Sequence, residues 1–402
     1  MGKTRIVAAA ALLGLTLATS AALAQGSVRI GLVTDMTGPL SDVQGPGSVE
    51  AAKIAIEEFG GTVLGRKIEV LSADHLNKAD VGVAIARKWV DRDDVGLLLD
   101  LGNSAVAIAV QDLAKDKNKI SITTGAASGE LTNKFCNANS FHWGYDSYQF
   151  AKASTGQIVK GGGDTWFFIT ADYAFGHALE NDARRIIESS GGKVVGAIRH
   201  PINTADYSSM LLQAQASGAK VIGIASAVSD LQNILKQGRE FDVFGEGQRP
   251  AALPMLLPDV HALGLRVSQG VVLSTVAYWD TDDKTRGFAD KFRARMGRPP
   301  SEAHAMNYSA VLHYLKAVAA AKTTDTAAVI AQMRQMPIDD AFTKGARIRA
   351  DGRIMRDIHL ARIKSPGQSK GAWDYLELLG PIKAEDAFRS PAESVCALLK
   401  RT

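Results

Sequence analysis

The chain has 402 residues, of which 46% are hydrophobic and 22% are charged, and its formal net charge is +4. This composition is ordinary for a folded globular protein and excludes a disordered, collagen-like or multi-span membrane chain. The length is sufficient for about two or three domains. The small basic excess, with no basic block interleaved with aromatic residues, argues against nucleic acid as a partner.

The N-terminal segment has the order of a secretory signal peptide. Lys3 and Arg5 precede an apolar run from Ile6 to Leu17, and Ala22-Leu23-Ala24 then provides an A-x-A cleavage site. The apolar run is shorter than the roughly 20 residues that a membrane-spanning helix needs. We therefore expect residues 1–24 to be removed and the mature protein to be exported.

Cys136 and Cys396 are the two cysteines of the chain. In an exported protein an even pair of cysteines commonly forms a disulfide, because the compartment is oxidising. We expect a bridge between Cys136 and Cys396. The alternative is two buried free thiols, since free cysteine packs well as a small apolar side chain.

From Val28 onward, short β-rich runs alternate with longer amphipathic runs, which indicates an α/β protein with parallel sheets covered by helices. Near-continuous apolar strands such as Trp166 to Ile169 are typical of sheets covered on both faces. The first series predicts strands over 28–36, 67–73, 95–101 and 119–124, with helices over 48–59, 79–90 and 105–115. The second series predicts strands over 166–170, 193–198 and 221–225, with helices over 178–189, 208–216 and 231–240.

Further elements follow the second series without a Pro-, Gly- or Ser-rich linker. The pattern predicts a strand over 270–275 and helices over 285–295, 303–321 and 327–333. Since no linker separates a third domain, a chain that crosses back and forth between two lobes is favoured.

The sequence lacks the motifs that would carry catalysis or hold a cofactor. It has no GxGxxG after a strand, phosphate-binding loop, HExxH, EF-hand loop or GxSxG elbow. Asp280, Asp282 and Asp283 lack the glycine and terminal acid of a calcium loop, and the histidines lack metal-ligand spacing. We predict that the protein is not an enzyme and needs no cofactor or metal.

Small and polar residues follow the strands of the first series, where open α/β sheets bind ligands. These loops precede helices, so their N–H groups and hydroxyls can bind a carboxylate. Helix capping explains any one loop alone, but three loops at one sheet edge favour a binding site. The candidate residues are Ser41, Asn103, Ser104, Ala126, Ala127 and Ser128.

The second series has loops in the matching places. Tyr173 and Phe175 follow its first strand, and Ser226 and Ala227 follow its third. The aromatic residues are either core residues or the apolar wall that a small ligand needs. We include all four residues in the candidate site.

Several segments in order along the chain resemble the periplasmic leucine/isoleucine/valine-type solute-binding proteins of ABC transporters. The resemblance covers nearly the whole mature chain. No single segment is decisive, but the order of the segments over this length is specific to the family. It rests on the signal peptide, Ile30-Gly31-Leu32, Met36-Thr37-Gly38-Pro39, Gly129-Glu130-Leu131-Thr132, Asp172-Tyr173-Ala174-Phe175-Gly176, Tyr278-Trp279-Asp280, Asn307-Tyr308-Ser309-Ala310 and the Ile348 to Arg353 turn.

The resemblance implies a type I periplasmic-binding-protein fold, in which two lobes joined by three crossovers close over a ligand. The implied partners are a small-molecule ligand and an inner-membrane ABC permease, and we expect a periplasmic monomer. The crossovers are expected near 143–148, 273–278 and 348–353. The expected lobes are residues 25–145 plus 276–350 and residues 146–275 plus 351–402.

By the same resemblance, Asn103, Ser104 and the 126–128 loop hold the ligand carboxylate. Amino-acid binders of this family place an acid after the fifth strand of the second lobe, to pair the ligand ammonium. Here that stretch is 255–257, Met-Leu-Leu, and the nearest acid is Asp259. Because a buried unpaired ammonium is costly, we expect an apolar or aromatic carboxylate, with a branched-chain or other hydrophobic amino acid as the alternative.

Two alternatives from other classes remain open. A cytoplasmic ligand-sensing regulator could use the same fold class, and cleavage of the signal peptide distinguishes it. A secreted hydrolase is disfavoured because no nucleophile and base constellation is evident.

Overall fold

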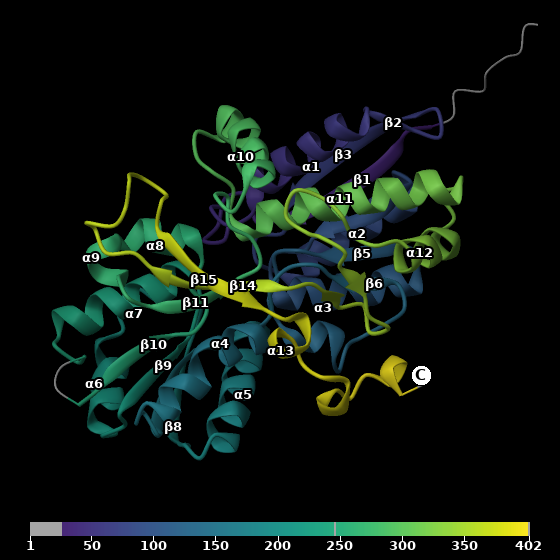
Figure 1. Cartoon of the computed structure of the whole chain (residues 1–402). Helices are drawn as coiled ribbons and strands as arrows, with labels where there is room; N and C mark the ends of the chain where they lie inside the picture. Colours follow the sequence, from purple (N-terminus) through teal and green to yellow (C-terminus); the bar gives the residue numbers. More distant parts are fainter. Residues whose placement is uncertain (1–25, 245–246, 401–402) are drawn as a thin grey trace, which may run out of the picture.

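The computed structural model describes residues 26–244 and 247–400, which form two α/β lobes. Figure 1 shows the lobes side by side, with strands inside each lobe and helices around them. The predicted fold class, two parallel-sheet lobes joined by three crossovers, is confirmed. The predicted signal peptide and its cleavage site lie outside the described residues. Within those residues, no helix is both long enough and apolar enough to cross a membrane.

The first lobe is built on a six-stranded sheet in the order β2-β3-β1-β4-β5-β6. Neighbouring strands are parallel, except that the short β2 is antiparallel to β3. Ile30 of the central β1 lies opposite Val70 on one side and Leu97 on the other. The strands are β1 (Val28–Thr34), β2 (Thr62–Val63), β3 (Arg66–Asp74), β4 (Val95–Asp100), β5 (Ile120–Thr123) and β6 (Ser140–His142).

Helices cover both faces of this sheet. Leu97 and Leu99 of β4 belong to the hydrophobic core beneath α1 and α11, whereas Leu98 belongs to the core beneath α2 and α3. Side chains alternate between the faces of a strand, so a run of apolar residues fills both cores. The helices are α1 (Gly45–Phe59), α2 (Ala79–Arg92), α3 (Ser104–Asp116), α10 (Asp283–Met296), α11 (Glu302–Ala321) and α12 (Thr326–Gln335).

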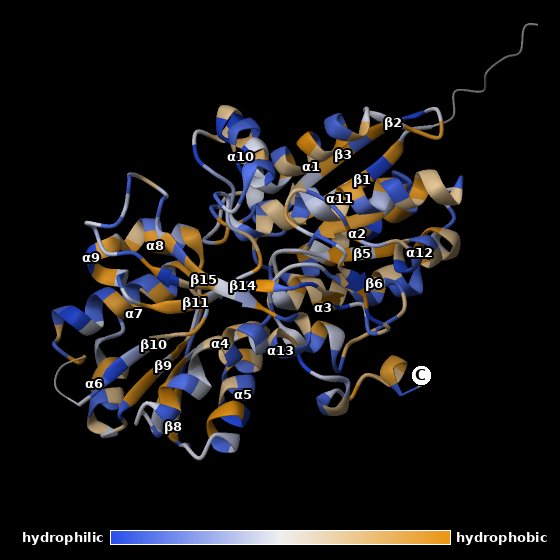
Figure 2. Ribbon diagram, viewed as in Figure 1, coloured by the Kyte–Doolittle hydropathy of each residue, from blue (hydrophilic) through white to orange (hydrophobic). Residues whose placement is uncertain are grey.

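The second lobe has a four-stranded parallel sheet in the order β10-β9-β7-β8, and a separate antiparallel sheet in the order β11-β14-β15. Figure 2 shows that apolar residues are concentrated in the strands of both lobes. The strands are β7 (Thr165–Ala171), β8 (Lys193–His200), β9 (Val221–Ala225), β10 (Arg249–Ala252), β11 (Val272–Thr275), β14 (Ile358–Ile363) and β15 (Leu376–Ile382). The helices are α4 (Ser147–Lys160), α5 (Ala174–Ser189), α6 (Ser208–Ala216), α7 (Val228–Glu240), α8 (Leu257–Leu263), α9 (Leu265–Ser268) and α13 (Ala384–Ala387).

The three crossovers lie close to their expected positions. The second runs from the end of β11 to the start of α10, over residues 276–282. The third lies a few residues later than expected, because a short hairpin of β12 (Arg347–Ile348) and β13 (Ile354–Met355) precedes β14. We retain the lobe boundaries 25–145 plus 276–350 and 146–275 plus 351–402 as a proposal.

Two buried arginines, Arg353 of the β12–β13 hairpin and Arg356 of the third crossover, bind the first crossover. Arg356 donates a hydrogen bond to the carbonyl oxygen of Trp143 at 3.1 Å, and Arg353 donates to the carbonyl oxygen of Gly144. Arg353 also lies 3.4 Å from a carboxylate oxygen of Asp146 and 3.9 Å from the ring centroid of Phe388. Two chain segments that connect the lobes are therefore held together by charge-assisted hydrogen bonds.

A disulfide joins Cys136 to Cys396, and their Cα atoms are 5.9 Å apart. Cys136 precedes β6 of the first lobe, so the bond fixes the C-terminal tail to that lobe. Val395 N–H adds a hydrogen bond of 2.8 Å to the Asn133 side chain. Arg389 of the same tail pairs with Asp182 of α5 in the second lobe. The tail therefore contacts both lobes.

Replacing both cysteines by serine is expected to lower the free energy of unfolding by about 3 to 5 kcal/mol, because a loop of 260 residues is closed by the bond. Urea denaturation of the Cys136→Ser, Cys396→Ser protein measures this difference. Wild-type protein unfolded with a reductant is the control and should show a similar loss. Equal stability with and without the bond would contradict the expectation.

Candidate functional site

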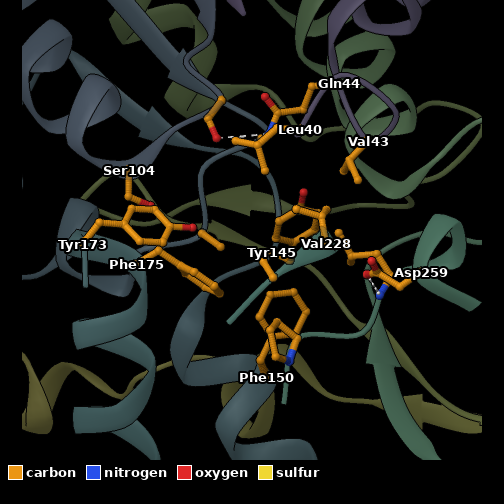
Figure 3. A pocket seen from close by; sticks show the side chains of 16 residues that line it. Leu40, Val43, Gln44, Ser104, Tyr145, Phe150, Tyr173, Phe175, Val228 and Asp259 are labelled. Atoms are coloured by element: carbon orange, nitrogen blue, oxygen red, sulfur yellow. Dashed lines mark hydrogen bonds between the residues drawn. The ribbon is translucent and has the colours of Figure 1, made fainter. Parts of the chain in front are cut away.

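A cavity lies between the lobes, at the carboxyl ends of the parallel strands. Its walls leave about 430 Å³ of space unoccupied by protein atoms, including the part open to solvent. Figure 3 shows the side chains that line it. The lining residues are Leu40, Val43, Gln44, Gly102, Ser104, Gly125, Ala127, Tyr145, Phe150, Tyr173, Phe175, Ala227, Val228, Pro254, Leu256 and Asp259.

The first lobe contributes hydrogen-bond donors. Ser104 is the first residue of α3, where Asn103 caps the helix by accepting bonds from the next turn. The Ser104 hydroxyl oxygen accepts a bond from Ser128 N–H at 3.2 Å, so its proton can be donated to a ligand. Across the described residues, neither Ser104 N–H nor Ala127 N–H has an acceptor. Free N–H groups at a helix start bind anions well.

Gln44 forms another part of the first-lobe wall. Its side-chain N–H donates to the carbonyl oxygen of Gly102 at 3.0 Å. Its Oε1 atom is buried and has no partner among the described residues, so it can accept a hydrogen bond from a ligand. A Cβ atom at Gly102 or Gly125 would collide with this side chain. These two glycines are therefore required for Gln44 to reach the cavity.

Four aromatic side chains supply most of the apolar surface. Tyr145 and Phe150 come from the first crossover and α4, with ring centroids 5.2 Å apart. Tyr173 and Phe175 come from the start of α5, with centroids 5.9 Å apart. Because all but one of these rings belong to the second lobe or its edge, closing the lobes brings apolar rings against the polar groups of the first lobe.

Backbone strain is present on both sides of the cavity. Leu101, before Gly102, has a φ angle of 53°, and Val228, at the start of α7, has a φ angle of 46°. Positive φ is rare for residues other than glycine, and especially for a β-branched residue. Such conformations persist where the surrounding structure enforces them, most often at functional sites. Their position is consistent with a ligand-binding role for this cavity.

Asp259 is the one carboxylate that lines the cavity within the described residues. Its oxygens accept hydrogen bonds from Leu256 N–H at 3.0 Å and from the Gln232 side chain at 2.9 Å. Burial raises its pKa to about 6. Figure 3 shows Asp259 on the opposite side of the cavity from Ser104 and Tyr173.

Two other acids of the second lobe are bound elsewhere. Asp172 is 2.8 Å from His177 Nε2, and Asp230 accepts a hydrogen bond from the hydroxyl of Tyr207 at 2.7 Å. Neither lines the cavity. They are therefore not placed to pair a ligand amine.

Glu302 connects the lobes beside the cavity. It opens α11 of the first lobe, and its Oε1 atom accepts hydrogen bonds from Leu257 N–H at 3.2 Å and from the Thr275 hydroxyl at 3.4 Å. Burial, with a smaller contribution from the negative charge of Asp259, raises its pKa to about 7. The contact with Leu257 crosses from the first lobe to α8 of the second.

The structure brings half of the sequence-based candidates to the cavity: Ser104, Ala127, Tyr173, Phe175 and Ala227. The others do not line it. Asn103 caps α3, and Ser128 caps the turn over Gly129–Thr132. The remaining three are engaged in local bonds: Ser41 with the Gly38 carbonyl, Ser226 with His200, and the Ala126 carbonyl with His142.

Sequence reasoning missed Gln44, Tyr145, Phe150 and Val228. Tyr145 and Phe150 fall where the chain leaves the first lobe, a position that a periodicity pattern does not mark as a site. Of these four residues, Gln44 is the one that a sequence pattern could have indicated. It precedes Gly45-Pro46-Gly47 at the start of a helix, and helix starts often bind ligands.

The cavity lies between two α/β lobes, at the carboxyl ends of their parallel strands, where open α/β sheets bind small ligands. Residues 27–372 match the model of the periplasmic binding protein family, and the chain belongs to this family. It is of the type that serves branched-chain amino-acid ABC transporters, so the resemblance noted in the sequence is confirmed.

Solved structures agree with this assignment. A periplasmic binding protein from Burkholderia mallei is 45% identical, with a TM-score of 0.90 over 92% of this chain and 99% of that one. A branched-chain amino acid ABC transporter ligand-binding protein from Burkholderia xenovorans is 40% identical, with a TM-score of 0.82 over 93% and 100%. A solute-binding protein from Rhodopseudomonas palustris, solved with 3,4-dihydroxybenzoic acid, shares the fold at 19% identity, with a TM-score of 0.79 over 92% and 99%.

The buried acid Glu302 is expected to make the protein less stable as pH rises. Its pKa is about 7 when folded and near 4.5 when unfolded, so the folded state binds more protons between these values. Stability therefore falls as pH increases through this window. The free energy of unfolding of wild type should drop by roughly 2 kcal/mol more than that of Glu302→Gln between pH 5 and pH 8.

Urea titrations at both pH values measure this difference. Asp290→Asn is the matched control, because the Asp290 side chain is 74% exposed and should leave the pH dependence unchanged. If the free energy of unfolding of Glu302→Gln depended on pH as that of the wild type does, folding would not raise the pKa of Glu302 and the expectation would be wrong.

Proposed function

We propose that the protein is the periplasmic solute-binding component of an ABC importer and that it binds a small apolar or aromatic carboxylate between its lobes. The observation that carries this proposal is the pairing of unbonded donors at Ser104 and Ala127 with the aromatic surface contributed largely by the second lobe. The family consists of transport proteins, so we infer binding and delivery to an inner-membrane permease, without turnover of the ligand.

The polar end of the ligand is proposed to lie at Ser104. Two N–H groups and one hydroxyl can each donate to carboxylate oxygens there, and hydrogen bonds to a charged group contribute more than neutral ones. Five other residues of the sequence-based set are proposed to support this surface without lining the cavity, because they cap helices or fix loops. They are Ser41, Asn103, Ala126, Ser128 and Ser226.

The body of the ligand is proposed to be apolar or aromatic. An α-ammonium group is adjacent to its carboxylate, whereas Asp259 lies across the cavity from Ser104. Asp259 is therefore badly placed to pair the amine of an amino acid held at Ser104, and an unpaired buried ammonium is costly. Aromatic carboxylates occupy this fold in solved relatives, as the 3,4-dihydroxybenzoic acid complex shows.

A branched-chain amino acid is the second candidate. The periplasmic ligand-binding protein of a branched-chain amino acid ABC transporter from Burkholderia xenovorans is 40% identical to this chain. In that case the Gln44 Oε1 atom, which is unpartnered among the described residues, would accept a bond from the ligand amine.

Binding is proposed to favour closure of the lobes. The ligand would contact Ser104 of the first lobe and Tyr173 of the second at the same time, which is possible only when the lobes are close together. A ligand shifts a conformational equilibrium by its differential contacts with the two states. The closed form would then be the one presented to the permease.

Benzoate, 4-hydroxybenzoate and 4-methylpentanoate are expected to stabilise the protein more than leucine, isoleucine, valine or phenylalanine. At about 1,000 times its dissociation constant, a ligand adds roughly 4 kcal/mol to the free energy of unfolding. A thermal-shift series followed by calorimetric titration measures this. Ser104→Ala and Tyr173→Ala should each weaken binding about tenfold or more, because each removes contacts from one lobe.

Asp259→Asn tests whether this carboxylate pairs a ligand amine. Carboxylic acids should bind the variant as tightly as the wild type, and an amino acid would lose affinity only if its amine were paired by Asp259 and not by Gln44. Strong stabilisation by leucine, isoleucine or valine, with none from the deaminated acids, would overturn the preferred ligand class. Unchanged affinity in both Ser104→Ala and Tyr173→Ala would overturn the site.

Export is proposed to remove residues 1–24. Intact mass spectrometry of a periplasmic fraction should give a chain that begins at Gln25, because the A-x-A pattern ends at Ala24. The total cell lysate serves as the control for uncleaved precursor. Recovery of only the full-length chain, in the cytosol, would contradict the transport function.

A further inference from the structure

The second lobe contains a larger cavity, which the ligand cleft does not include. It lies between β10 and β11, which are edge strands of two different sheets: β10 pairs only with β9, and β11 only with β14. Figure 1 places both strands in the second lobe near α7 and α9. The cavity has about 1,030 Å³ of space unoccupied by protein atoms, including the part open to solvent.

The walls of this cavity are mainly apolar. Leu235 and Met255 are 6% and 2% exposed, and Ala251 of β10 is 5% exposed. Val272 of β11 and Ile158 near the end of α4 complete the apolar surface. An apolar hollow between two strand edges can bury part of an aliphatic chain, which contributes about 0.8 kcal/mol for each buried CH₂ group.

Two arginines line the same cavity. Arg239 of α7 donates one hydrogen bond to the Val267 carbonyl oxygen at 2.7 Å. Arg249 of β10 donates one to the Ile158 carbonyl oxygen at 3.2 Å. Throughout residues 26–244 and 247–400, neither guanidinium has a carboxylate within ion-pair distance. Each is anchored by one N–H and keeps other donors for an anion.

We propose that this cavity binds a second ligand, an amphipathic monocarboxylate whose aliphatic chain lies between β10 and β11. Its carboxylate is bound by Arg239 and Arg249, which are the only charged groups that line the cavity within the described residues. The apolar wall selects the chain, and the positive charge, which no carboxylate of residues 26–244 and 247–400 pairs, selects the anion. The site is separate from the cleft between the lobes, and no residue lines both.

An extended peptide fits this gap less well than an aliphatic chain. A peptide that adds to a strand edge needs a row of free N–H and C=O groups. Pro250 occupies β10 and has no N–H, and β10 and β11 have four residues each. Short edges interrupted by proline resist strand addition.

The test uses decanoate, with 1-decanol as the uncharged probe of the same length, and the full mature protein. Calorimetric titration should detect decanoate binding that is at least tenfold weaker in the Arg239→Gln, Arg249→Gln double variant. Arg266→Gln on α9 is the matched control, because Arg266 is exposed and does not line the cavity. 1-Decanol should bind the wild type and the double variant equally.

A second set of measurements separates this site from the cleft. Ser104→Ala should leave decanoate binding unchanged, since Ser104 lines only the cleft. A diazirine-bearing decanoate should label peptides that contain Leu235, Met255 or Val272. Labelling confined to peptides with Tyr145 or Tyr173, loss of binding in Ser104→Ala, or undiminished binding in the double arginine variant would each overturn the proposal.

Discussion

The contact between the first and third crossovers is the constraint on which the two-lobed arrangement depends. Arg353 and Arg356 are buried, and their guanidinium groups bind the backbone carbonyls of Gly144 and Trp143. A buried guanidinium must keep its hydrogen-bond partners, because leaving it unpaired costs several kcal/mol. The two segments are therefore held together, and a rotation of the lobes that kept these bonds would have its pivot at this contact.

Rotation about that point separates groups in proportion to their distance from it. Glu302 of the first lobe binds Leu257 N–H of the second, so opening the cleft breaks this bond or carries α8 with α11. The aromatic rings and the donors at Ser104 also move apart. Contacts at the crossovers would be kept if the lobes opened, whereas contacts across the cavity would be lost. A ligand that makes contacts in one state only shifts the equilibrium toward that state.

Much of the fold was predictable because its central strands are buried on both faces. The apolar runs of β4 and β7 leave no alternative to interior strands, and α11 follows from a long uninterrupted helical pattern. Helix α4 was not predicted, since Ser147–Lys160 mixes polar and small residues without a clear apolar stripe. Strands β14 and β15 were not predicted either, and Gly380 and Pro381 of β15 are residue types that weaken a strand pattern. The loops at the strand ends located the cavity, but Gln44 and Asp259 reach it only through packing between distant segments.

The disulfide also sets an order for maturation of the chain. Cys136 belongs to the first lobe, yet its partner follows 260 residues later, after both lobes and all three crossovers. No covalent closure of the first lobe is possible until Cys396 has been synthesised and has reached the oxidising compartment. The bond can therefore stabilise the folded protein only after the whole chain has been made, and a chain that ends before Cys396 depends on non-covalent contacts alone.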